Sequence, residues 1–175
     1  MTYDLDLDCG ICTVRSWRRY DRVSLSKHAD NPEVARHLRD RFPQPYRLRD
    51  ADEWIDFCRS CAPQTDFAIV VDGEAVGGIG LIPQDDIARI SAEIGYWLGE
   101  PVWGRGIATA AVTAFANWAF EAFELRRLYA CVLENNPASC RVLEKCGFER
   151  EGRLRSSALK DDQVLDQFLY AKLRA

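Results

Sequence analysis

Residues 102–112 read VWGRGIATAAV, in which two glycines flank an arginine and a run of small and branched apolar residues follows. Glycine lets the main chain approach a ligand closely, and the first turn of a helix presents N–H groups that have no partner within the helix. A glycine-rich turn that opens a helix is therefore typical of a site for an anion. Taken alone, the stretch also fits a plain strand-to-helix turn without a ligand.

This stretch differs from two common phosphate-binding motifs. A dinucleotide fold has Gly-x-Gly-x-x-Gly after its first strand, whereas here the third glycine position is Thr109 and the stretch lies beyond the middle of the chain. A P-loop requires Gly-Lys-Ser/Thr, which the stretch lacks. The sequence predicts neither of these two sites, so the anion has to be of another kind.

Strands and helices alternate around this turn. Asp72-Gly73 is a dipeptide suited to a tight hairpin, and Gly147 is placed to end a helix. Residues 21–61 have helical periodicity that is interrupted by three prolines. We expect strands at 13–17, 67–71, 74–82, 90–99, 127–133, 148–154 and 167–173, and further helices at 107–123 and 138–146. This order predicts a mixed α/β fold around one central sheet, with an antiparallel meander before the glycine turn.

The bulk properties indicate a single domain, residues 1–175, of a soluble globular kind. Hydrophobic residues make up 47% of the sequence and charged residues 29%, and the formal net charge is −4. This charge argues against a nucleic-acid partner, and no apolar run reaches the roughly 18 residues of a membrane helix, so no membrane partner is expected. The N-terminal MTYDLDLDCGIC is acidic where a signal peptide is basic and then apolar, which predicts a cytoplasmic protein.

Two Cys-x-x-Cys pairs, at 9–12 and 58–61, raise the possibility of zinc, but 45 residues separate them, against roughly 15–20 in common zinc ribbons. A continuous strand through CGICTV would direct Cys9 and Cys12 to opposite faces. The WIDFCRSCA segment places four apolar residues on one helical face, which makes its cysteines core residues: Trp54, Phe57, Cys58 and Cys61. No metal is expected, and the odd count of seven cysteines argues against a disulfide framework.

Two further blocks of sequence carry a family resemblance. EIGYWLGEPVWGRGIATAAV at 93–112 and ENNPASCRVLEKCGFEREG at 134–152 resemble the GNAT superfamily of N-acetyltransferases, in particular the branch similar to the ribosomal-protein alanine acetyltransferases RimJ and RimL. The family pattern Gln/Arg-x-x-Gly-x-Gly/Ala corresponds to residues 103–108, with tryptophan in the first place. With RFPQPY and DADEW upstream, the resemblance spans essentially the whole chain. It implies a central, mostly antiparallel and splayed sheet flanked by helices.

The resemblance also implies that the anion is the pyrophosphate of acetyl-CoA, used as a cosubstrate. Main-chain N–H groups at the helix start would hold the phosphates, Arg105 would add charge, and the splayed strand EIGYWL would pair with the pantetheine arm. Asn136 would reach the cofactor from the far side. The implied cofactor-binding residues are Tyr96, Trp97, Leu98, Trp103, Gly104, Arg105, Gly106, Ile107, Ala108 and Asn136.

Acetyl transfer to an amine by direct attack in a ternary complex requires a base, because an alkyl ammonium is almost wholly charged at neutral pH. Glu93 is the candidate base, with Ile94 and Trp97 expected to raise its pKa by desolvation. A structural carboxylate is the alternative role for Glu93. Ser139 is the candidate donor of a proton to the coenzyme thiolate, or it only orients the sulfur or caps the helix that begins there.

The acceptor is expected to be a protein N-terminus or a small-molecule amine, since the fold does not choose among them. Two other functions remain open: a catalytically inactive acyl-CoA-binding or sensing module, and a zinc-stabilised interaction domain. The final strand QFLYAKL would be able to pair across a homodimer axis. His28 and His37 are expected at surface or capping positions, because neither has a partner at ligand spacing.

Overall fold

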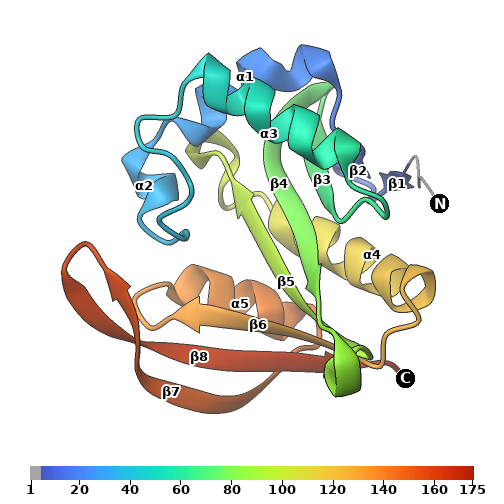
Figure 1. Cartoon of the computed structure of the whole chain (residues 1–175), viewed down its shortest axis with the longest axis vertical. Coiled ribbons are helices and arrows are strands. Elements are labelled where there is room, and N and C mark those ends of the chain that lie inside the picture. Colours follow the sequence, from blue (N-terminus) through green and yellow to red (C-terminus); the bar gives the residue numbers. More distant parts are fainter. Residues whose placement is uncertain (1–4) are drawn as a thin grey trace. The chain divides into compact units, whose positions relative to one another are not determined.

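The computed structural model describes residues 5–175, which form a mixed α/β arrangement (Figure 1). Residues 1–4, which belong to the acidic N-terminal stretch and to the expected domain 1–175, lie outside the described residues. In the described part, eight strands follow the order β1-β2-β3-β4-β5-β6-β8-β7. The chain divides into two compact units: a first unit of residues up to Gly80 together with Tyr96–Ala114, and a second unit of Leu81–Gly95 together with Phe115–Ala175.

The first unit contains the N-terminal antiparallel strands. These strands are β1 (Asp6–Asp8), β2 (Thr13–Arg15), β3 (Asp66–Val71) and most of β4 (Glu74–Pro83), each paired with the next. Asp72 and Gly73 join β3 to β4 with φ values of 49° and 81°, as a type I′ hairpin turn requires. The hairpin that this dipeptide predicts is therefore confirmed.

Helices of the first unit pack on these strands. They are η1 (Arg19–Asp21), α1 (Arg22–Ala29), α2 (Pro32–Ala35), α3 (Leu48–Ser60) and η3 (Glu100–Val102), followed by the start of α4 (Ile107–Ala122). Trp17, Leu25 and Ile55 lie in their shared core. Asn31 caps α2 by accepting the Glu33 N–H at 2.8 Å, and Pro32 occupies its first position, which explains why a helix begins there. The interrupted helical region that the three prolines predict is confirmed.

One predicted helical face differs from the observed one. In α3, Cys58 is 1% exposed and belongs to the core, as expected, but the Phe57 side chain is 54% exposed. Cys61 lies just beyond the helix, where the backbone is already extended. Consecutive residues of a helix point about 100° apart, so the narrow core stripe of α3 takes Cys58 and leaves its neighbour outside.

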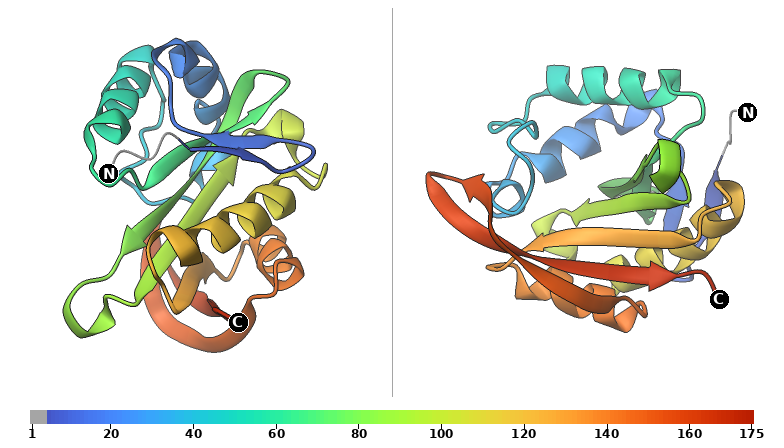
Figure 2. Two further views of the ribbon diagram at one scale, coloured as in Figure 1. Left: turned by 90° about the vertical axis from the view of Figure 1, so that its right-hand side faces the viewer. Right: turned by 60° about the horizontal axis from the view of Figure 1, so that its bottom comes forward.

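The second unit is built around an antiparallel group of long strands. β6 (Arg127–Leu133) pairs with β8 (Gln163–Leu173), which pairs in turn with β7 (Glu149–Lys160), and Figure 2 shows the long β7–β8 hairpin in orange and red. The first three residues of β5 (Ser91–Leu98) run parallel to β6. The short η2 (Asp86–Ala88) and α5 (Pro137–Lys145) complete the unit, together with the C-terminal part of α4.

The pairing between β5 and β6 is short. It runs from Ser91, opposite Arg127, to Glu93, opposite Tyr129, whereas β5 continues to Leu98 and β6 to Leu133. In a splayed sheet, two neighbouring parallel strands stop pairing although both strands continue. The short β5–β6 pairing has this feature, as expected from the family resemblance. The mixed α/β fold with a mostly antiparallel sheet is confirmed.

The QFLYAKL residues belong to β8, which is an inner strand of the sheet, whereas pairing across a dimer axis requires an edge strand. β8 bonds to β6 along one side and to β7 along the other, so its main-chain groups are already used. The outer strand of this unit is β7. Strand pairing between two copies would have to use an edge strand, such as β7 or β1, and the homodimer itself stays a prediction. Among the described residues, no helix is long and apolar enough to cross a membrane.

Candidate functional site

The glycine turn predicted to hold an anion lies in the first unit, between η3 and α4. Gly104 and Gly106 have φ values of 73° and 79°, a conformation that other residues rarely adopt. A Cβ atom added to Gly104 would meet nothing within 4 Å, and one added to Gly106 would meet only the tip of Ile11 at 3.8 Å. Packing therefore does not explain these glycines, and the open space in front of them leaves the main chain accessible.

The start of α4 provides the donors of this turn. Gly106 O accepts the first helical hydrogen bond, from the Ala110 N–H at 3.0 Å. The N–H groups of Ile107 and Ala108 precede the first intrahelical donor, as in every α-helix. The first turn of α4 contains no acidic residue, and Arg105 is exposed beside it. Partial positive charge at a helix start and a neighbouring guanidinium both favour an anion here.

Trp103 has a different role from that of the glycines after it. Its N–H donates to Glu100 O at 3.1 Å, which closes the η3 turn, so this N–H is already used. Its indole Nε1 donates to Leu98 O at 2.8 Å, and the Gly99 N–H donates to Val76 O at 2.8 Å. These three bonds fix the path of the chain from the end of β5 to Gly104. Trp103 thus supports the turn, and the available N–H groups begin at Gly104.

The last residues of β5 approach β4 closely. A Cβ atom on Gly77 would overlap Trp97 O, so the Trp97 carbonyl is turned toward β4. In a strand the N–H and C=O of one residue point to the same side, and those of its neighbours point to the other side. The main-chain groups of Tyr96 and Leu98 are therefore directed to the opposite edge of β5, the edge that the pantetheine arm is expected to use.

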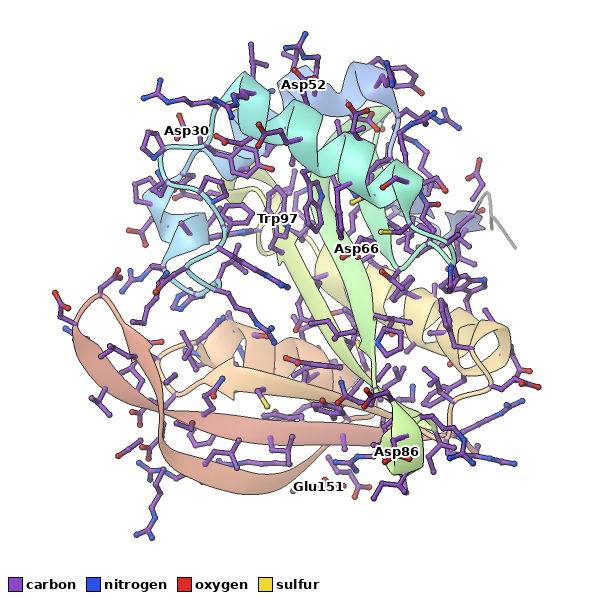
Figure 3. The ribbon with its side chains drawn as sticks, viewed as in Figure 1. Asp30, Asp52, Asp66, Asp86, Trp97 and Glu151 are labelled. Atoms are coloured by element: carbon purple, nitrogen blue, oxygen red, sulfur yellow. The ribbon has the colours of Figure 1, made fainter. Side chains whose placement is uncertain are left out.

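The indole of Trp97 belongs to the core of the first unit. Figure 3 shows Trp97 between β5 and the helices, and its ring contacts Phe42 edge-on, with 5.5 Å between centroids. Phe42 also contacts Tyr46 at 5.0 Å. A Cβ atom on Gly78 would lie 2.9 Å from the Trp97 Nε1, so glycine makes room for the indole. The Trp97 side chain thereby fixes β5 against the segment that joins α2 to α3.

Glu93 lies in the second unit, on the face of β5 opposite to its apolar neighbours. Ala92 and Ile94 are buried (0% and 2% exposed), whereas Glu93 is half-buried. Successive side chains of a strand point to opposite faces, so Ile94 does not line the surroundings of the Glu93 carboxylate. The expectation that Ile94 desolvates Glu93 is wrong for this reason.

Tyr129 is a neighbour of Glu93 that sequence reasoning missed. It lies directly opposite Glu93 in the β5–β6 pairing and is also half-buried. Arg127, two residues before it, has its guanidinium 5.9 Å from the centre of the Tyr129 ring and forms a two-bond ion pair with Glu151. The hydrogen bonds from Arg127 hold the pKa of the Glu151 carboxyl below its usual range. Predicting that Tyr129 lies beside Glu93 would have required the parallel register between β5 and β6, which the sequence does not show.

Asn136 and Ser139 lie together at the start of α5. Asn136 is the N-cap residue, and its Oδ1 accepts the Ser139 N–H at 3.2 Å. The cap that the sequence analysis considered for Ser139 therefore belongs to Asn136, because Pro137 occupies the first helical position and Ser139 the third. Both side chains are partly exposed.

We expect Asn136→Asp to keep wild-type thermal stability, because a carboxylate retains the acceptor for the Ser139 N–H, and to raise the KM for acetyl-CoA, because the amide donor is lost. Asn136→Ala should in addition lower the free energy of unfolding by about 0.5–2 kcal/mol, since the cap disappears. Thermal denaturation and acetyl-CoA titration separate the two effects. An unchanged KM in both variants would restrict Asn136 to the cap.

His28 is buried, contrary to the surface or capping position predicted for it. It is 5% exposed, and its Nε2 lies 2.9 Å from Glu74 Oε1, an oxygen that also accepts from Lys27 Nζ at 2.7 Å. The hydrogen bonds from Lys27 and His28 lower the pKa of the Glu74 carboxyl. A Cβ atom on Gly99 would overlap the His28 ring. His28 thus packs against the residue between β5 and η3, through a partner 46 residues away that no local pattern indicates.

The CGIC segment forms a tight turn rather than the continuous strand expected. β1 ends at Asp8 and β2 begins at Thr13, and Gly10, with a φ of 82°, reverses the chain between them. Cys9 and Cys12 consequently face each other on one side of the hairpin instead of pointing to opposite faces. Among residues 5–175 no group of three or more Cys, His, Asp or Glu side chains could hold a metal ion.

A comparison with known families supports this geometry. The family model described as an acetyltransferase (GNAT) domain matches residues 12–149. The chain belongs to the GNAT family, and the protein is thus an acyltransferase of the acetyl-CoA-dependent class. The family resemblance, the enzyme class and the acetyl donor expected from the sequence are confirmed.

Individual relatives point in the same direction. YdaF of Bacillus subtilis (strain 168), provisionally named a ribosomal N-acetyltransferase, is 32% identical over 146 residues, which cover 83% of this chain and 74% of that protein. The spermidine N(1)-acetyltransferase of Vibrio cholerae is 27% identical over 81% of each chain. The structure of Mycobacterium smegmatis RimJ in complex with CoA-disulfide superposes with a TM-score of 0.87 at 26% identity, covering 99% of this chain and 90% of that one.

Proposed function

We propose that this chain, as a single domain spanning residues 1–175, transfers the acetyl group of acetyl-CoA to a primary amine by direct attack in a ternary complex. The observation that carries the proposal is the glycine turn before α4. Its two glycines have positive φ and almost empty space where side chains would be, and helix N–H groups and Arg105 lie beside them. A pyrophosphate fits such a turn.

The donor is held by main-chain groups in this proposal. The N–H groups from Gly104 to Ala108 bind the pyrophosphate, with charge added by Arg105. The main-chain groups of Tyr96 and Leu98 face the edge of β5 on which the pantetheine arm pairs. Trp97 and Trp103 act indirectly, since the first anchors β5 in the core and the second ties Leu98 O to the turn. Asn136 supplies an amide donor from α5.

The chemistry requires two protons to leave the substrate ammonium, one before the attack and one from the nitrogen after it, and one proton to reach the departing sulfur. Glu93 removes the proton from the ammonium, directly or through a water, and the free amine attacks the thioester carbonyl. Collapse of the tetrahedral intermediate breaks the C–S bond and releases the coenzyme as a thiolate. Ser139 orients the sulfur or passes it a proton, although a serine hydroxyl is a weak acid. The products are an acetamide and coenzyme A.

The acceptor belongs to one of two groups, protein N-termini or small-molecule amines. Similarity to YdaF and to a ribosomal-protein-serine acetyltransferase of Escherichia coli supports a protein acceptor, and similarity to a spermidine acetyltransferase supports a small-molecule amine. All of these acceptors contain the same reacting group, a primary amine that is charged at neutral pH. Because Glu93 would deprotonate any of these amines in the same way, its chemistry does not distinguish between the two groups of acceptors, and an experiment has to identify the acceptor.

We expect release of coenzyme A thiol with at least one member of an amine panel that contains N-terminal alanine and serine peptides, spermidine and free amino acids. Mass spectrometry of the acceptor should show one added acetyl group. Because the protein has seven cysteines of its own, thiol release is measured against enzyme without acetyl-CoA and against acetyl-CoA without amine. Tight binding of acetyl-CoA with no transfer to any amine would support the inactive binding module instead.

A further inference from the structure

Cys9 and Cys12 form a close pair that acetyl transfer leaves unused. The β1–β2 register matches Asp8 with Thr13, and one further step sets Cys9 opposite Cys12. The Cys9 N–H donates to Cys12 O at 2.9 Å, in agreement with this register. Opposed residues of antiparallel strands have Cα atoms about 4.5–5.5 Å apart. That separation falls within the range of about 4.4–6.8 Å that a disulfide spans.

The two thiols have different environments. Cys9 is partly exposed, whereas Cys12 is 6% exposed. A hydrogen bond from the Cys12 thiol lowers the pKa of Cys9, and the same bond, together with burial, raises the pKa of Cys12. A partly exposed thiol whose pKa is lowered by a second thiol beside it is the arrangement that reactive dithiols use. Cys58 lacks these properties, because burial raises the pKa of its thiol.

The surroundings of the pair carry negative charge. A cavity of about 190 Å³ lies beside the turn and is lined by residues of the turn, including Cys12, and by residues of the β3–β4 hairpin. Asp8 and Asp72 both line it. Two carboxylates in the lining attract a cationic reagent and repel an anionic one.

We propose that Cys9 and Cys12 are a redox-active dithiol, which cationic low-molecular-weight disulfides oxidise to an intramolecular disulfide. The Cys9 thiolate attacks one sulfur of the reagent and forms a mixed disulfide, releasing one thiolate that takes up the proton lost by Cys9. Cys12 then loses its proton and attacks the Cys9 sulfur, which releases the second thiol. Two electrons pass from the cysteine pair to the reagent, and two molecules of free thiol result.

The disulfide also reaches the glycine turn, a step that rests on the proposed function. The Cys12 Sγ also lies 3.9 Å from Ile107 O, so its one hydrogen is shared between this carbonyl and Cys9, and Ile11 lies next to Gly106. Oxidation removes the Cys12 hydrogen, so Ile107 O loses this donor at the start of α4. We expect acetyl-CoA to bind the oxidised protein about two- to fivefold more weakly, the size of effect that one weak hydrogen bond can produce.

The redox step is tested by treating the reduced full-length protein with cystamine, trapping free thiols and digesting with trypsin. The peptide that ends at Arg15 carries both Cys9 and Cys12, and we expect it to lose two hydrogens without retaining cysteamine. In Cys12→Ser the mixed disulfide on Cys9 should persist, and in Cys9→Ser the buried Cys12 should stay unmodified. Cys61→Ser is the matched control and should behave as wild type. Oxidised glutathione, which is anionic, should react more slowly than cystamine.

Two results would overturn the dithiol: a peptide that keeps both thiols free in cystamine, or a Cys9 that reacts no faster than Cys61. The coupling is measured separately, as the acetyl-CoA affinity of the oxidised and the reduced protein. Equal affinities in the presence of a proven disulfide would contradict the coupling. A reduced protein that does not bind acetyl-CoA would contradict the proposed function and leave the disulfide result standing, because the peptide analysis needs no acetyl-CoA.

Discussion

Gly106→Val and Gly104→Val are expected to weaken acetyl-CoA binding by at least about tenfold, which corresponds to about 1.4 kcal/mol of binding free energy. Valine does not tolerate the positive φ of either position, and its branched side chain would fill the space in which the phosphates approach the N–H groups. Isothermal titration calorimetry with acetyl-CoA measures the change.

Gly73→Val is the matched control for these two variants. Gly73 has a φ of 81° and open space around its Cβ position, like Gly104, but it lies in the β3–β4 hairpin. Its substitution imposes the same backbone strain without blocking the glycine turn. We expect all three variants to lose thermal stability and only the two turn variants to lose affinity. Wild-type affinity in both turn variants would mean that the pyrophosphate binds elsewhere.

Glu93→Gln is expected to lower kcat by about 10²–10⁴-fold, the usual contribution of a general base. Glutamine keeps the shape and the hydrogen-bonding capacity of the side chain but does not accept the proton. The KM for acetyl-CoA should stay close to wild type, since the base acts on the amine. The loss should shrink as the pH rises, because an alkyl amine with a pKa near 10 then becomes free without help from the enzyme. Steady-state rates between pH 6 and 9 show this convergence.

Ser139→Ala provides the contrast for Glu93→Gln. The substitution keeps the N–H that Asn136 Oδ1 accepts, so α5 retains its cap. We expect a smaller loss of kcat than for Glu93→Gln and no recovery at high pH, because the coenzyme thiolate is already an adequate leaving group near neutral pH. If Glu93→Gln retained wild-type kcat across the whole pH range, Glu93 would be the structural carboxylate of the alternative interpretation, and another group would have to take the proton.

Local sequence patterns sufficed for most of the fold. Asp72-Gly73 defined the hairpin, and Gly147, with a φ of 80°, ended α5 as predicted, where the Phe148 N–H donates to Leu143 O at 3.0 Å. The glycine turn was placed before α4 correctly. In each case the residues that determine the conformation are adjacent in the sequence, so their spacing carries the information.

Local sequence patterns did not predict the contacts between segments that are far apart along the chain. His28 was expected near the surface, and its burial depends on Glu74 and Gly99, which are far along the chain. The sequence pattern favours a strand over the Cys-Gly-Ile-Cys segment because the apolar residues that follow Gly10 mask a two-residue reversal. The place of Tyr129 beside Glu93 depends on the parallel register of two strands. Periodicity gives the faces of one strand but not its partner.

The alternation along β5 limits how the length of this strand can change. Glu93 lies on one face of β5, and the main-chain groups of Tyr96 and Trp97 point to opposite edges of the strand. The number of residues between Glu93 and Tyr96 determines how these directions relate to one another. Inserting or deleting one residue between Glu93 and Tyr96 would reverse every later face and edge relative to the carboxylate. Evolution and protein engineering can therefore alter β5 by substitution, whereas insertions and deletions are tolerated only in the connecting loops. A sequence aligned with a gap inside residues 93–98 would not preserve this arrangement of the site.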